Sequence, residues 1–238
     1  MTCRAILWCG YIEPRRPTEE AAIFRHDIEL AIRAAHARGV PPDEIHALVC
    51  DRALLPDDFR GHWHRADWQS FQRIMGKLAQ IATTQDACLF IAINHGDRDG
   101  LLIEREPASE FDDGSVIDTP EFLSPGLLAR FLDAIEGQQI AIVATCHAGV
   151  FLAIESSCRM VCAACDENQP LRWNIHEQHP PRNPFLYELL SHWGGVSLAD
   201  YDAPTRCSLD DAFRAIASEF PGSAIRGRAS WPDPEPAP

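Results

Sequence analysis

The sequence predicts one α/β domain, a three-layer sandwich in which helices flank a mostly parallel sheet. Short apolar runs rich in β-branched residues alternate along the chain with longer segments whose apolar residues recur every three or four positions. These are the periods of buried strands and of amphipathic helices. Strands that alternate with helices form parallel sheets, because each helix returns the chain to the same end of the sheet by a right-handed crossover.

Five apolar runs are expected to be the strands, and they cover residues 4–9, 45–50, 87–95, 140–146 and 159–165. Helical spacing predicts helices over residues 18–38, 68–82, 125–136, 183–194 and 208–220, with a short helix at 149–156. Ser124-Pro125 is a typical helix start, with a capping hydroxyl followed by proline in the first turn. Residues 51–64 are predicted to be a polar loop, 101–103 a short edge hairpin and 104–118 an acidic excursion.

No repeat or linker divides residues 1–224, which are therefore expected to form a single domain. Residues 225–238 are rich in glycine, arginine and proline, and we expect a flexible tail there. With 238 residues and 46% apolar content, the chain is long enough to bury a substantial core.

The net charge of −14 argues against binding to nucleic acid or to anionic membranes, which requires clustered lysine and arginine. No apolar run approaches the roughly 20 residues of a membrane span. The first residues enter a strand-like run without the sections of a secretory signal, so the protein is expected to be cytoplasmic. The nine cysteines are an odd number, and several lie in apolar runs, which favours reduced, mostly buried thiols over disulfides.

A metal site is not expected. Cys158, Cys162 and Cys165 resemble half of a zinc site, with His176 and His179 as imaginable partners, but the second cysteine pair is missing. His62-Trp-His64 is interpreted as part of a surface loop. The sequence implies no cofactor.

The ends of two predicted strands carry side chains that are able to react. One strand ends in Asn-His95-Gly96, and another ends in Ala-Thr-Cys146-His-Ala-Gly149. Ligands of open parallel sheets bind outside the carboxyl ends of the strands, so these residues are candidates for a Cys/His dyad. A neighbouring imidazole and the start of the short helix after Cys146 would raise the reactivity of the thiol. The N–H groups of Gly96 and Cys146 could hold a developing oxyanion.

The pattern of apolar strand, Asn-His-Gly, capped helix, apolar strand and Ala-Thr-Cys-His-Ala-Gly resembles the caspase-like cysteine peptidases, the superfamily of caspases, metacaspases, legumains and separases. The resemblance extends from Arg4 to about Trp193, and Cys146 follows His95 by 51 residues, close to the ~50 residues that separate this pair in caspases. Ala148 replaces the usual serine, and Thr145 replaces the usual alanine. The resemblance implies that His95 is the general base, Cys146 the nucleophile and a thioester acyl-enzyme the intermediate.

The resemblance also implies that the loop after the next strand shapes the pocket for the residue before the scissile bond. Asp166 and Glu167 of this loop, with Asp97 from the histidine loop, favour arginine or lysine there. A preference for aspartate would require arginines instead. Arg15, Arg16 and Arg172 keep that alternative open.

Only residues 148–158 separate the nucleophile strand from the next, so no long cleavable linker is present, and we expect activity as a single chain. This leaves room for control by an activating partner or ligand. The expected substrate is a protein or peptide, in a cell-death or defence response by family analogy. The alternative is a catalytically inactive caspase-like adaptor or regulatory scaffold, against which the intact pair counts. An α/β hydrolase is disfavoured because Gly-x-Cys-x-Gly is absent.

Overall fold

The computed structural model describes residues 1–10, 17–93, 95–103, 121–171, 182–197, 205–229 and 231–232. Its main sheet consists of β1 (Cys3–Cys9), β2 (Ile45–Val49), β3 (His62–Arg65), β4 (Ala87–Ala92), β8 (Gln138–Val143), β9 (Arg159–Ala163) and β10 (Ala224–Arg226). The strand order is β10-β9-β8-β4-β1-β2-β3. Every neighbouring pair is parallel except β9 and β10. The predicted mostly parallel sheet is confirmed.

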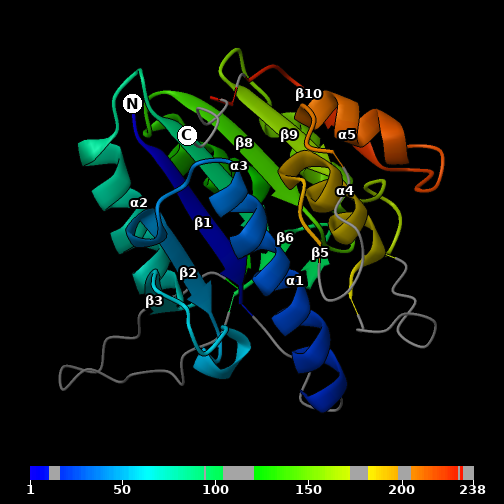
Figure 1. Cartoon of the computed structure of the whole chain (residues 1–238), viewed down its shortest axis with the longest axis horizontal. Coiled ribbons are helices and arrows are strands. Elements are labelled where there is room, and N and C mark those ends of the chain that lie inside the picture. Colours follow the sequence, from blue (N-terminus) through cyan, green and yellow to red (C-terminus); the bar gives the residue numbers. More distant parts are fainter. Residues whose placement is uncertain are drawn as a thin grey trace.

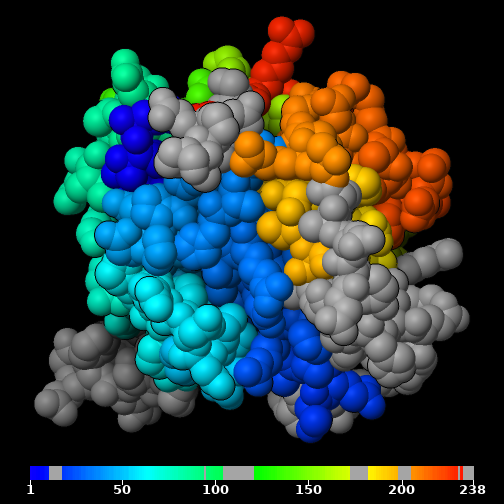
Figure 2. All heavy atoms as spheres, in the orientation of Figure 1, coloured from blue at the N-terminus to red at the C-terminus, as the bar shows by residue number. Residues whose placement is uncertain are grey.

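Helices cover both faces of this sheet. Helices α1 (Pro17–Ala37), α4 (Pro184–Gly194) and α5 (Leu209–Ile216) lie on the face turned to the viewer in Figure 1, and α2 (Trp68–Ile81) and α3 (Pro125–Asp133) lie behind it. The space-filling view shows α1, in blue, across the middle of the near face, beside α4 and α5 in yellow and orange (Figure 2). The three-layer α/β architecture is therefore confirmed.

Helix α2 shows how the sequence determines one of these layers. Its buried residues are Phe71, Ile74, Met75 and Leu78, which share one face of a helix. The carboxylate of Asp67 caps the first turn by accepting the Ser70 N–H at 2.7 Å. Phe71 meets the ring of Trp8, a fully buried residue of β1, edge to face at 5.4 Å between centroids. An amphipathic helix is thereby fixed against the centre of the sheet.

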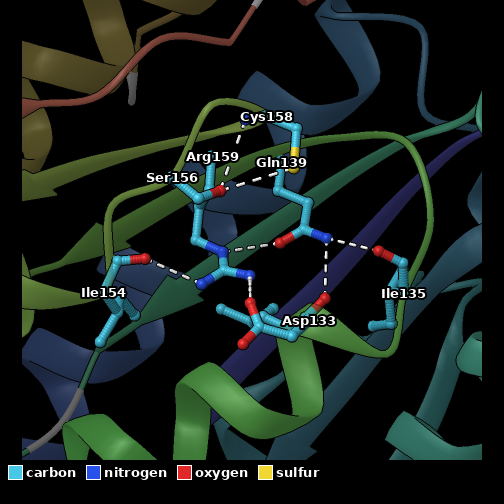
Figure 3. Close-up of polar contacts among 8 residues, drawn as sticks. Asp133, Ile135, Gln139, Ile154, Ser156, Cys158 and Arg159 are labelled. Carbon is cyan, nitrogen blue, oxygen red and sulfur yellow. Dashed lines mark hydrogen bonds and ion pairs between the residues drawn. The ribbon is translucent and has the colours of Figure 1, made fainter.

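A buried polar cluster joins β8, β9 and the end of α3 (Figure 3). Arg159, only 2% exposed, donates to Gln139 Oε1 at 2.7 Å, to Ile154 O at 2.8 Å and to Asp133 Oδ1 at 2.6 Å. The amide of Gln139 in turn donates to Leu132 O at 2.8 Å, in the last turn of α3, and to Ile135 O at 2.6 Å, just after the helix. The buried guanidinium is thus satisfied, as such a group must be if it is not to destabilise the fold.

A second, three-stranded sheet follows β4. It consists of β5 (Gly96–Asp97), β6 (Gly100–Leu102) and β7 (Phe122–Leu123) in antiparallel order. Gly100 has φ +141°, and a Cβ at this position would lie 2.3 Å from Leu123 O, so the turn requires glycine. The hairpin expected near residues 101–103 is therefore part of a larger unit, and the acidic excursion lies outside the described residues.

Two strands of the main sheet differ from the sequence prediction. Residues 62–64 were expected to lie in a polar loop but form, together with Arg65, the edge strand β3, which pairs with β2. Its side chains are mostly exposed, so no apolar period marks it in the sequence. Residues 224–226 form β10, whose last two residues belong to the segment expected to be a flexible tail, and Trp231 beyond them donates to Arg38 O at 2.9 Å. Residues 233–238 lie outside the described part.

Within the described ranges, no helix is long and apolar enough to cross a membrane. All nine cysteines are free thiols. Burial raises the pKa of Cys88, on β4, to about 12.

Candidate active site

His95 and Cys146 emerge from neighbouring strands. Strands β4 and β8 are paired in parallel with Ala92 opposite Val143, and each functional residue lies three positions beyond its strand. The backbone of Gly96 packs directly on the Cys146 segment, because a Cβ on Gly96 would lie 2.7 Å from Cys146 O. The predicted adjacency of the two strands is therefore confirmed, and the close backbone approach explains why glycine follows the histidine.

The Cys146 thiol is partly buried and held by a loop from the next strand. The backbone N–H of Leu171 donates to Cys146 Sγ at 3.3 Å. Burial raises the pKa of the Cys146 thiol and the charge of Asp97 raises it further, while the backbone N–H groups of Leu171 and Cys146 act in the opposite direction. The pKa of the Cys146 thiol is raised overall, so the thiol carries its proton at neutral pH. The sequence had instead led us to expect activation of the thiol by a helix start. The short helix that follows is a 3₁₀ segment, η3 (Ala148–Ile154).

The residues after Cys146 are fitted to the loop that follows β9. His147 has a left-handed backbone with φ 56°, and its N–H donates to Gln169 O at 2.9 Å. Its Nδ1 lies 2.9 Å from Glu167 O. A Cβ on Gly149 would lie 2.3 Å from Glu167 N, so only glycine allows the loop to approach this closely. The Cys-His-Ala-Gly motif is thus partly a packing motif.

Cys165 also holds the loop that follows β9 in place. Its Sγ donates to Thr145 O at 3.3 Å and to Gln169 O at 3.2 Å. Burial is the largest cause of the raised pKa of this thiol. A protonated thiol suits this position, because it donates a hydrogen bond to a backbone carbonyl next to Cys146.

His95 meets a partner that the sequence did not indicate. Its Nε2 lies 3.0 Å from Oε2 of Glu20, in the first turn of α1, and the side chains are 29% and 13% exposed, respectively. The ring of Phe24, one helical turn further on, meets the imidazole edge to face at 5.8 Å. Acidic residues are common in first helical turns, so Thr18-Glu-Glu predicted only a helix start.

Asp27 links α1, through Asn183, to the segment that leads to Cys146. It is completely buried, and its two carboxyl oxygens accept the Asn183 N–H at 2.9 and 3.2 Å. The side-chain amide of Asn183 donates to Ala144 O at 3.4 Å, two residues before Cys146. Burial raises the pKa of Asp27 to about 8, although the hydrogen bond from Asn183 and the charge of Arg182 oppose the shift.

The three acidic residues expected to bind substrate are all exposed. Asp97 lies in β5, close enough to raise the pKa of the Cys146 thiol by its charge. Asp166 acts similarly on Cys165, and its side chain accepts the Asn168 N–H at 2.9 Å. Asp97 therefore acts on the Cys146 thiol, and Asp166 acts on the neighbouring Cys165 thiol. The arginines of the alternative pocket, at positions 15, 16 and 172, lie outside the described residues.

A cavity of about 640 Å³ lies beside the same loop. Its described lining includes Cys165, Leu171, Phe185 and Phe220, and does not include His95 or Cys146. Leu171 is thus shared between this cavity and the thiol. The cavity therefore lies just past the carboxyl end of β9, the strand parallel to β8, although neither His95 nor Cys146 lines it.

The described residues contain no group of three histidine, cysteine, aspartate or glutamate side chains placed to hold a metal ion. The three histidines at the β2–β3 edge instead stack, with His46 Nδ1 3.3 Å from His64 Nε2 and ring centroids of His46 and His62 5.0 Å apart. Burial lowers the pKa of both His46 and His64 to about 4, so both are neutral at physiological pH. His176 and His179 lie outside the described residues.

The sequence matches no protein-family model and no curated protein. Among solved structures, the chain is similar to protein GSU0716 from Geobacter sulfurreducens, with 14% identity and a TM-score of 0.53 over 97% of this chain and 95% of that one. It is also similar to a secreted C11 cysteine protease from Bacteroides thetaiotaomicron in complex with an irreversible peptide inhibitor, with 11% identity and a TM-score of 0.45 over 92% of this chain and 59% of that one. The first likeness concerns the fold alone, and the second is too distant to support a statement about this chain.

Proposed function

We propose that this protein is a cysteine endopeptidase of the caspase-like superfamily, with Cys146 as nucleophile and His95 as general base. The parallel pairing of β4 with β8 carries this proposal, because it brings both strand ends to one edge and packs Gly96 on the Cys146 peptide. The order of the motifs along the chain and the fold both agree with it. The raised pKa of the thiol makes a base necessary, since the thiolate is the nucleophile.

The reaction proceeds in two displacements. His95 takes the proton of the Cys146 thiol, and the sulfur attacks the carbonyl carbon of the scissile peptide bond. The N–H groups of Gly96 and Cys146 hold the oxyanion, and each such donor typically lowers the barrier by about 2.7 to 4 kcal/mol. The C–N bond then breaks, and the leaving amine takes the proton from His95. Water, deprotonated by His95, attacks the thioester, releasing the acid and restoring the thiol.

The residue before the scissile bond is proposed to be arginine or lysine. The charge of Asp97 reaches the Cys146 thiol, and the exposed pair Asp166 and Glu167 lies in the loop whose backbone packs on His147 and Gly149. A partly desolvated carboxylate selects the opposite charge, and arginine adds bidentate hydrogen bonds. The substrate is proposed to be a protein or peptide in the cytoplasm.

The protein is proposed to act as a single chain. Between β8 and β9 the chain forms η3 and a tight turn in which Ser156 and Arg159 are paired, so a processing protease finds no extended segment there. Regulation would then come from a partner or ligand rather than from cleavage at this point.

The test is covalent labelling with a peptidyl acyloxymethyl ketone that carries arginine before the reactive group. The wild type is expected to be modified at Cys146, and Cys146→Ala to be unmodified. Cys207→Ala, which removes another partly exposed thiol, should label like the wild type. Equal labelling of the wild type and Cys146→Ala would refute the peptidase proposal.

A peptide library that varies arginine, lysine, asparagine and aspartate before the scissile bond tests the pocket. Cleavage after arginine or lysine supports the acidic pocket, and cleavage confined to aspartate overturns it. If no peptide is cleaved and no probe reacts, the noncatalytic adaptor becomes the better account.

A further inference from the structure

The contact between α1 and His95 has a geometry that bears on proton transfer. Glu20 Oε2 and His95 Nε2 are 3.0 Å apart, a normal length for a charge-assisted hydrogen bond. Glu20 lies in the first turn of α1, where a negatively charged side chain interacts favourably with the helix dipole. With side-chain exposures of 13% and 29%, the pair is partly withdrawn from water, where such a contact is stronger than on an open surface.

A second contact holds the same ring. Phe24 follows Glu20 by four residues, shares its helix face, is completely buried, and meets His95 with an interplanar angle of 82°. Asp27, on the next turn of that face, is hydrogen-bonded to Asn183, which contacts Ala144 on the nucleophile segment. One face of α1 therefore contacts the histidine directly and the cysteine segment through one intermediate residue.

The chemical consequence concerns the tautomer of the imidazole. A neutral imidazole carries its proton on one nitrogen, and the partner of that nitrogen decides which one. An ionised carboxylate only accepts hydrogen bonds, so the contact requires the proton on Nε2. The other nitrogen, Nδ1, then holds the lone pair that can take a proton from a thiol.

We propose that Glu20 is a positioning residue that holds His95 in the Nε2–H tautomer and thereby makes Nδ1 the basic nitrogen of the site. The proposal rests on the proposed role of His95 as general base. Glu20 also stabilises the imidazolium that forms when His95 has taken the thiol proton, because the carboxylate stays within hydrogen-bonding distance of its Nε2–H.

The tautomer is measured directly by nitrogen-15 NMR of the full-length protein labelled in histidine, at a pH where the ring is neutral. The His95 signals are assigned by their loss in His95→Gln. The wild type is expected to show a protonated Nε2 and an unprotonated Nδ1 at His95, and Glu20→Ala a mixture of tautomers. Glu19→Ala is the matched control, since it removes a carboxylate from the exposed neighbouring position of the same turn. An unchanged tautomer in Glu20→Ala overturns the proposal.

Steady-state kinetics on the peptide selected by the library gives the second readout. Glu20→Ala is expected to lower kcat about 10- to 100-fold, part of the 10²- to 10⁴-fold that a positioned base contributes, with KM changed less than about 3-fold. Glu20→Gln keeps the shape and one acceptor oxygen, so it should fold like the wild type and have an intermediate kcat. A kcat for Glu20→Ala within about 2-fold of the Glu19→Ala control would show that Glu20 is only a structural ion-pair partner.

The two readouts separate this inference from the proposed function. If the wild type cleaves no peptide but the tautomer of His95 depends on Glu20, the peptidase proposal fails while the positioning contact stands. If the wild type is active and neither tautomer nor kcat depends on Glu20, the positioning role fails and the dyad stands.

Discussion

Replacing Asp27 by asparagine is expected to change how the stability of the protein depends on pH. The carboxyl group is completely buried, and burial raises its pKa from 3.8 to about 8. The folded protein therefore keeps a proton on Asp27 over a pH range in which the unfolded chain has lost it. The N–H of Asn183 contacts both carboxyl oxygens, and an asparagine oxygen can accept the same hydrogen bond.

The sign and the size of the effect follow from proton linkage. Below pH 3.8 both states are protonated, and the group has no effect on the pH dependence. As pH rises from 3.8 to 8, only the folded state binds the proton, so stability falls by about 1.4 kcal/mol per pH unit. Asparagine does not titrate. The free energy of unfolding of Asp27→Asn minus that of the wild type should therefore increase by about 4 kcal/mol between pH 5 and pH 8.

The assay is denaturant unfolding of both proteins at pH 5, 6, 7 and 8, followed by tryptophan fluorescence and circular dichroism. All other titrating groups are common to both proteins, so they cancel in the difference. Asp57→Asn, which removes an exposed carboxylate, should give a curve nearly parallel to that of the wild type. Parallel curves for Asp27→Asn and the wild type would refute the conclusion that Asp27 is neutral in the fold.

Three further predictions concern the histidine stack, the loop after Cys146 and the buried arginine. The pKa of His46 is lowered to about 4, so the free energy of unfolding decreases as pH falls from 6.5 towards 4. His46→Gln should remove about 1.4 kcal/mol per pH unit of this decrease. Urea unfolding from pH 4.5 to 6.5 measures it, and an unchanged dependence of the unfolding free energy on pH would contradict the prediction. Gly149→Ala places a Cβ against Glu167 N, so it should lower the free energy of unfolding by about 1 to 3 kcal/mol and slow the labelling of Cys146. Unfolding midpoints and labelling rates both equal to those of the wild type would show that the loop moves aside without cost. Arg159→Ala leaves the buried Gln139 Oε1 without its donor and should lower the free energy of unfolding by about 1 to 3 kcal/mol; a loss below about 0.5 kcal/mol would mean that water replaces the guanidinium.

Elements with a strong apolar period were predictable from the sequence. The stripe of α2 and the unbroken apolar run of β8 depend on local side chains, and burial on one or both faces of an element leaves its period in the sequence. Helix starts were predictable where a capping side chain precedes the first turn, as Ser124 does by accepting the Leu127 N–H at 3.3 Å. Strands β3 and β10 were missed because they are short and lie at the sheet edges, where pairing with a neighbour, rather than burial of their own side chains, makes them strands.

The candidate site likewise has features that the sequence alone determines and contacts that only the tertiary structure creates. By itself, the sequence determined that His95, Gly96 and Cys146 follow buried strands, because apolar runs ending in polar and small residues mark strand ends. The tertiary structure decided which groups surround them: Glu20 on His95 across 75 residues of sequence, and Leu171 on Cys146 across 25. No local pattern marks such partners, because a carboxylate in a first helical turn and a backbone N–H in a loop are ordinary features until packing brings them to a reactive group. Asp27 is the extreme case, since its charge state depends on burial that only the assembled layers provide.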